Sequence, residues 1–145
     1  MTRAVLETPA ASARIATKAL LLPATIGVLL GASPRPAAAQ AFAIDFSWQG
    51  IARCTDRSPE IRLSGVPAGT RTLDVQMVDL DVPSFKHGGS AVAYDGEAAI
   101  RAGAVRYVGP CPPGQRHQYR ITVTARDPGG KTLGAASMTH EFPPP

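Results

Sequence analysis

The chain has 145 residues, enough for a single domain, and a formal net charge of +4 at pH 7. Four of its 15 basic residues but only one of its 11 acidic residues lie in the first 40, so the rest of the chain carries 11 basic and 10 acidic groups. This even balance, with only three tyrosines and four phenylalanines to stack on bases, excludes nucleic acid as an expected partner.

The first 40 residues have the features of a secretion signal. Arg3, Arg14 and Lys18 precede an almost wholly apolar run over residues 19–32, and small residues follow at positions 37–39. This apolar run is shorter than the roughly 20 residues that a membrane-spanning helix needs. We therefore predict a signal peptide over residues 1–40, cleaved to leave a periplasmic or secreted domain over residues 41–145 with no stable membrane span. A retained anchor or a later start codon stays open.

Beyond the leader, short alternating or apolar segments are separated by glycine, proline and aspartate. No segment keeps a helical period through three turns, which predicts an all-β domain. In chain order, the expected strands cover residues 42–48, 61–63, 73–77, 91–94, 119–125 and 132–142.

The strand expected at residues 73–77 leads into an acidic cluster, Asp79 and Asp81, and then into a turn over residues 86–90 that contains His87. Strand ends are positions where sites are commonly built. A structural alternative is that the two aspartates cap a turn before Pro83, and that the histidine is solvated.

Residues 109–119, GPCPPGQRHQY, join a proline-stiffened turn to His117 and Tyr119. On an extended chain, residues two apart point to the same face, so the imidazole and the phenol are expected side by side. A stiff backbone loses little entropy on binding, and beside these side chains it suits capture of a small anion. Alternatively, Tyr119 is a core residue and the turn only anchors a disulfide.

The two cysteines, Cys54 and Cys111, both lie beyond the leader. In an exported protein an even number of cysteines usually forms bridges, so a disulfide between them is expected. Two buried free thiols are the alternative, and a zinc site is disfavoured because neither cysteine has a CxxC partner.

Taken in order, several motifs resemble the phosphatidylethanolamine-binding protein family, also called Raf kinase inhibitor-like proteins. The motifs are Ser58-Pro59, residues 63–70 (LSGVPAGT), residues 79–83 (DLDVP), His87 and residues 109–119, so the match spans about residues 46–126. The resemblance implies a compact antiparallel β-sandwich of the short exported bacterial type. It also implies a small cavity for phosphate-like or acidic head groups, no cofactor, and cysteines at similar places.

Carried over motif by motif, the ligand-binding residues here are Asp79, Asp81, His87, Gly109, Pro110, His117 and Tyr119. No metal ligand and no catalytic residue is implied. The family usually has proline where this chain has Leu80, and tryptophan where this chain has Gly88. The second difference predicts that one wall of the cavity is missing.

The resulting expectation is an exported binding protein, not an enzyme, for a small anion or a phospholipid head group. An anion would favour protonated imidazoles, and one aspartate would orient them. One alternative is an interaction or inhibitor module of the cell envelope, with an envelope protein as its partner and a vestigial pocket. Another is metal-assisted or acid–base hydrolysis, although no nucleophile elbow and no HExxH motif is present.

Overall fold

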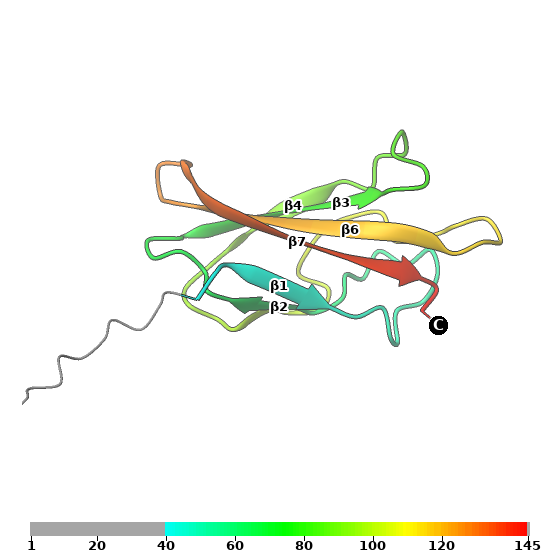
Figure 1. Cartoon of the computed structure of the whole chain (residues 1–145), viewed down its shortest axis with the longest axis horizontal. Helices are drawn as coiled ribbons and strands as arrows, with labels where there is room; N and C mark the ends of the chain where they lie inside the picture. The colour runs from blue at the N-terminus through cyan, green and yellow to red at the C-terminus, as the bar shows by residue number, and fades with distance from the viewer. Residues whose placement is uncertain (1–39, 145) are drawn as a thin grey trace, which may run out of the picture. The chain divides into compact units, whose positions relative to one another are not determined.

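Two antiparallel sheets stack face to face in the computed structural model, which describes residues 40–144 (Figure 1). The smaller sheet has the order β1-β2-β5 and contains β1 (Ala43–Phe46), β2 (Ile61–Ser64) and β5 (Ala99–Ile100). The larger sheet has the order β4-β3-β6-β7 and contains β3 (Thr72–Asp79), β4 (Gly89–Ala93), β6 (His117–Arg126) and β7 (Thr132–Phe142). The all-β prediction is confirmed.

The predicted signal peptide lies outside the described residues, apart from Gln40. Over residues 40–144, no helix is long and apolar enough to cross a lipid bilayer.

The core follows from the two-residue period of the central strands. In β3 every second side chain is buried, and the same holds in β6. The antiparallel register sets Val75 opposite Val123 and Met77 opposite Ile121, so the two buried rows lie side by side on one face of the sheet. This face packs against the smaller sheet.

β1 and the residues just after it contribute two large aromatic side chains to the core. Phe46 and Trp48 continue the alternation predicted for residues 42–48, and the Trp48 ring is 2% exposed. It makes edge-to-face contacts with Tyr119 and Phe142, with ring centroids 6.0 and 5.7 Å apart. Together with a hydrogen bond from Trp48 Nε1 to the carbonyl oxygen of His140 at 3.4 Å, these contacts join the segment after β1 to β6 and β7.

Two local features differ from the sequence expectation. The turn expected at residues 86–90 ends early, because β4 begins at Gly89. A Cβ atom on Gly89 would lie 1.9 Å from the carbonyl oxygen of Val75, so this close approach of β4 to β3 requires glycine. Strand β5 was not predicted, because two residues are too few to show an alternating pattern in the sequence. It pairs only with Ile61 and Arg62.

Candidate functional site

Asp79 lies at the end of the buried row of β3. The row runs through Leu73, Val75 and Met77, and the same two-residue step carries the Asp79 side chain to the core face, where it is 3% exposed. Its cross-strand partner is Tyr119. The strand phase therefore places a carboxylate at the polar end of an apolar core.

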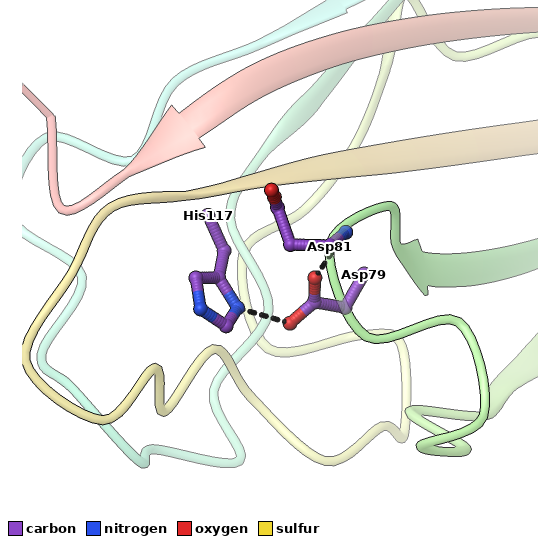
Figure 2. Close-up of side chains that lie close together, drawn as sticks. All are labelled: Asp79, Asp81 and His117. Carbon is purple, nitrogen blue, oxygen red and sulfur yellow. Dashed lines mark hydrogen bonds and ion pairs between the residues drawn. The ribbon is translucent and has the colours of Figure 1, made fainter.

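The Asp79 carboxylate accepts hydrogen bonds on both oxygens. Oδ1 accepts the backbone N–H groups of Asp81 and Val82 at 2.9 and 3.0 Å, and Oδ2 accepts from His117 Nδ1 at 2.7 Å (Figure 2). Burial raises the pKa of Asp79, but the hydrogen bonds lower the pKa by more than burial raises it. The pKa therefore lies below its ordinary value. Asp79 is therefore a carboxylate at neutral pH, and it both caps the turn and orients His117.

His87 approaches the same carboxylate from the loop before β4, and the residue is 4% exposed. Its Nδ1 lies 2.7 Å from the carbonyl oxygen of Val108, which can only accept, so Nδ1 carries the proton. Its Nε2 lies 4.0 Å from Asp79 Oδ2. His117 is likewise protonated at Nδ1, so the Nε2 atoms of both rings have no proton unless the rings are charged.

Tyr119 packs against both histidines. Its ring centroid lies 5.4 Å from that of His87 and 6.2 Å from that of His117. Burial, and after it the negative charge of Asp79, raise the pKa of the Tyr119 hydroxyl well above its ordinary value. The ring is thus a core residue, while its hydroxyl stays a neutral hydrogen-bond donor.

These side chains line a cavity of about 450 Å³. The lining comprises Cys54, Asp79, Val82, Phe85, His87, Val108, Gly109, Cys111, Pro112, Pro113, His117 and Tyr119. Five of the seven residues proposed from the sequence are thus brought together, and Asp81 and Pro110 are not part of the lining. The strand ends at Asp79, so the following turn leaves Asp81 exposed.

Asp81 and Pro110 instead hold backbone segments in place. Asp81 Oδ2 accepts the backbone N–H of Gln118 at 2.6 Å, and Figure 2 shows its carboxylate turned toward β6. Pro110 is buried, and its carbonyl accepts the N–H of Cys54 at 2.9 Å.

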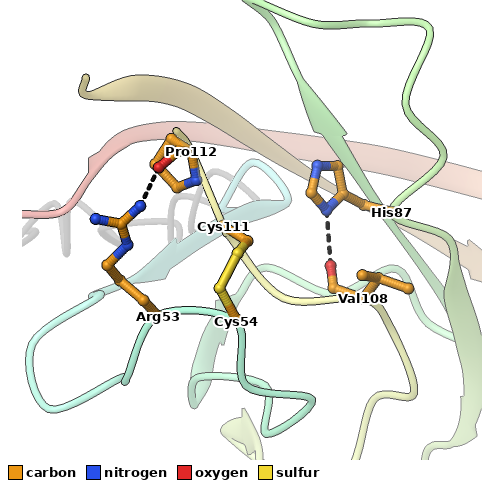
Figure 3. The surroundings of a disulfide bond; sticks show 6 residues. All are labelled: Arg53, Cys54, His87, Val108, Cys111 and Pro112. Carbon is orange, nitrogen blue, oxygen red and sulfur yellow. Dashed lines mark hydrogen bonds between the residues drawn. A yellow bond between two sulfur atoms is a disulfide. The ribbon is translucent and has the colours of Figure 1, made fainter. Parts of the chain in front are cut away.

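The wall formed by residues 109–113 is fastened to the loop before β2. A disulfide joins Cys54 to Cys111, and Arg53 donates a hydrogen bond to the carbonyl oxygen of Pro112 (Figure 3). A Cβ atom on Gly109 would lie 1.7 Å from the carbonyl oxygen of Thr55. The two segments can therefore approach this closely only because residue 109 is a glycine. Both cysteines are exposed, which excludes the alternative of buried free thiols.

Exposed apolar side chains form a rim on part of the cavity, and this rim was not predicted from the sequence. Val82, Phe85 and Val108 line the cavity and are 41, 51 and 52% exposed, and Leu80, 40% exposed, lies beside them in the chain. The centroid of the Phe85 ring lies 4.6 Å from that of the His87 ring, so an aromatic side chain lines the cavity beside His87. The available signal was the presence of large apolar residues in otherwise polar connecting segments.

Asp79, Asp81 and His117 are less suited to binding a metal ion than to the hydrogen bonds that they already make. One ligand atom each from Asp79, Asp81 and His117 lies within 4.8 Å of the others, which is close enough for a shared ion. However, both oxygens of Asp79 and one oxygen of Asp81 already accept protein hydrogen bonds, and His117 Nδ1 donates one of them. A metal would have to displace these bonds.

Two antiparallel sheets, with a largely apolar cavity that contains Asp79, His87 and His117 at the ends of β3 and β6, define a small β-sandwich domain with one disulfide. The family model for phosphatidylethanolamine-binding protein matches residues 32–142, and the chain belongs to this family. The resemblance inferred from the motifs is therefore confirmed.

One of the similar solved structures agrees with the fold. A phosphatidylethanolamine-binding protein homologue from Chlamydia trachomatis has a TM-score of 0.53 and 18% identity, over 70% of this chain and 97% of that chain. YbcL of E. coli, described as a new member of the mammalian family, has a TM-score of 0.46 and 19% identity, over 60% of this chain and 80% of that chain. The search of curated proteins found no match.

Proposed function

We propose that the protein is an exported binding protein whose cavity holds a small oxyanion, such as a phosphate or the phosphate-bearing head group of a lipid, without turning it over. The observation that carries this proposal is the convergence of two imidazoles and one carboxylate in the cavity of about 450 Å³. That volume suits a small ligand.

The charge of the cavity sets a condition on anion binding. The residues that line it include no lysine and no arginine, so positive charge must come from His87 and His117. With Asp79 ionised and both imidazoles neutral, these three lining side chains have a net charge of −1, and protonation of both rings changes this to +1, while the nearby carboxylate of Asp81 makes the surroundings more negative. An anion is therefore bound together with protons, and binding is expected to be stronger at pH 6 than at pH 8.

Protonation also supplies the hydrogen-bond donors. Because Nδ1 of each ring is already committed to Val108 or Asp79, only the two Nε2 atoms change from acceptors to donors when the rings become charged. The Tyr119 hydroxyl adds a neutral donor. Two charged donors and one neutral donor match the several acceptor oxygens of a phosphate group.

The apolar rim favours a ligand whose head group is attached to a larger apolar body, such as a lipid. An apolar patch remote from the histidines would favour a protein partner, whereas the exposed large apolar side chains of residues 40–144 lie at the cavity or next to it in the chain. Export to the periplasm or outside the cell is supported by the leader composition and by the exposed disulfide, which such compartments maintain.

The test is calorimetric titration of phosphoryl-ethanolamine into the wild type and two histidine variants at pH 6. We expect His117→Ala to weaken binding at least tenfold while its circular dichroism stays that of a folded β-protein. His140→Ala is the matched control, since His140 lies on β7 and does not line the cavity. Equal affinity in the wild type and His117→Ala, or equal loss in both variants, would exclude the proposed site and favour an interaction module with a vestigial pocket.

A further inference from the structure

Two arginines face each other outside the cavity. Arg57 and Arg106 are partners in an isolated antiparallel bridge between the loop before β2 and the segment after β5. Directly opposed residues project their side chains to the same side, and two like charges in this arrangement are destabilising. A local arrangement that costs stability in this way is expected at a functional or a strained site.

Within residues 40–144, no acceptor group of the protein itself pairs with the guanidinium groups of Arg57 and Arg106 to offset their repulsion. Over residues 40–144, the arginines that form ion pairs are Arg62, Arg71, Arg116 and Arg126. The guanidinium groups of Arg57 and Arg106 are absent from the ion pairs and side-chain hydrogen bonds of residues 40–144, so the donors of both groups face solvent or a ligand.

The two side chains line one groove of about 470 Å³, together with Asp56, Val105 and Tyr107. None of these residues lines the cavity that contains the histidines. The groove therefore lies apart from the proposed binding site, although the same two backbone segments contribute to both.

The backbone below the arginines is held in place. The Tyr107 hydroxyl donates to the carbonyl oxygen of Arg57 at 3.2 Å, and the Arg106 N–H donates to Ser90 Oγ at 3.0 Å. The buried Ser58 hydroxyl accepts the N–H groups of Gly103 and Val105 at 3.1 and 3.3 Å. These bonds fix the backbone from which both side chains start, so less conformational entropy is lost when a ligand binds between them.

We propose that Arg57 and Arg106 form a second oxyanion site that clamps a single phosphate or sulfate group between two guanidinium groups. Guanidinium forks match the oxygens of such groups in a bidentate manner. Asp56 lines the same groove and reduces the net charge of the three groups to +1. The two guanidinium charges favour a dianion over a monoanion, and the groove lining includes no further lysine or arginine that would extend the site along a polyanion.

The experiment follows the arginine Nε–Hε signals of the whole chain by NMR during titration with inorganic phosphate and with sulfate. We expect saturable shifts of the Arg57 and Arg106 signals, and at least a tenfold loss of affinity at Arg57 in Arg106→Gln. Arg120→Gln is the matched control, because Arg120 is exposed on β6 and its cross-strand partners are Val78 and Thr139, not a second cation. Its removal should leave the response intact.

A second readout uses stability. Without added anion, Arg106→Gln should melt a few degrees higher than the wild type, because the like-charge contact is removed. Sulfate should then raise the melting temperature of the wild type more than that of the variant. Shifts that never saturate, or an Arg57 response that survives in Arg106→Gln, would overturn the proposal. His117→Ala should leave the Arg57 response unchanged, which separates this site from the cavity.

Discussion

Asp79 is the residue on which the geometry of the cavity depends most. Its two oxygens together accept two backbone N–H groups of the following turn and the imidazole of His117, and its Oδ2 lies 4.0 Å from His87 Nε2. One side chain thus fixes the turn after β3 and the tautomer of a histidine on β6. The alternative that Asp79 only caps a turn accounts for the hydrogen bonds of Oδ1 but not for the bond from His117 to Oδ2.

Asp79→Asn tests this double role. The amide oxygen can still accept from the turn, but the amide nitrogen would meet the donor Nδ1–H of His117, so we expect a loss of about 1–3 kcal/mol in the free energy of unfolding. The imidazole should also change its tautomer, visible in its 15N shifts. Asp81→Asn is the control, and its exposed position predicts a change below about 0.5 kcal/mol. Equal losses in both variants would contradict the assigned roles.

The lowered pKa of Asp79 predicts a pH dependence of stability. A carboxyl whose pKa in the folded state lies below the ordinary value of 3.8 stabilises the fold above that value, and this contribution is lost as the pH falls through the folded-state pKa. Urea unfolding between about pH 5 and pH 2 should therefore show a steeper loss for the wild type than for Asp79→Asn. Exposed carboxyls such as Asp45 titrate alike in both proteins, so the difference isolates Asp79. Parallel curves would show that its pKa is not lowered by folding.

At the scale of the strands, the sequence predicted most of what positions the site. Alternation identified β3, β6 and β7, and the same two-residue step that buries Met77 and Ile121 carries Asp79 and Tyr119 to the core face. The sequence predicts which side chains of a strand face the core, because apolar and polar residues alternate with the two faces of the sheet. The position of Asp81 could not be read in this way, since the strand ends two residues before it.

The loops were less predictable because they have no period. His87 is buried by contacts with distant segments, namely the carbonyl oxygen of Val108 and the ring of Tyr119. Phe85 became part of the cavity wall for the same reason. Such contacts depend on where the chain returns in space, and a single sequence does not specify this for a loop.

Gly109→Ala tests how tightly the cavity wall is seated. The added methyl group would overlap the carbonyl oxygen of Thr55, so the two segments must separate, and we expect a loss of about 1–3 kcal/mol in the free energy of unfolding. Gly114→Ala is the control, since open space surrounds that position and only its φ of +86° opposes a side chain, at about 1 kcal/mol. Chemical unfolding of both variants gives the comparison. A Gly109→Ala protein as stable as Gly114→Ala would contradict the close approach.

For the molecule as a whole, the disulfide is expected to be a major source of stability. It links residues 57 positions apart, and closing a loop of this length stabilises a domain by about 4 kcal/mol in the chain-entropy model. The Cys54→Ser, Cys111→Ser double variant should lose about this amount in urea unfolding, compared with the oxidised wild type. A loss below about 1 kcal/mol would show that the hydrogen bonds from Arg53 and Cys54 already hold the wall in place.

The central claim, a cavity whose two histidines bind an oxyanion, is tested most directly by histidine-resolved NMR of the purified, oxidised protein. Phosphate, phosphoryl-ethanolamine and short-chain phosphatidylethanolamine would be titrated near pH 6 and near pH 8, with sulfate added because its charge is constant over this range. We predict saturable shifts of His87 and His117 at millimolar concentration, stronger at the lower pH, with His140 unaffected. Unchanged His87 and His117 signals with all four ligands would contradict the account.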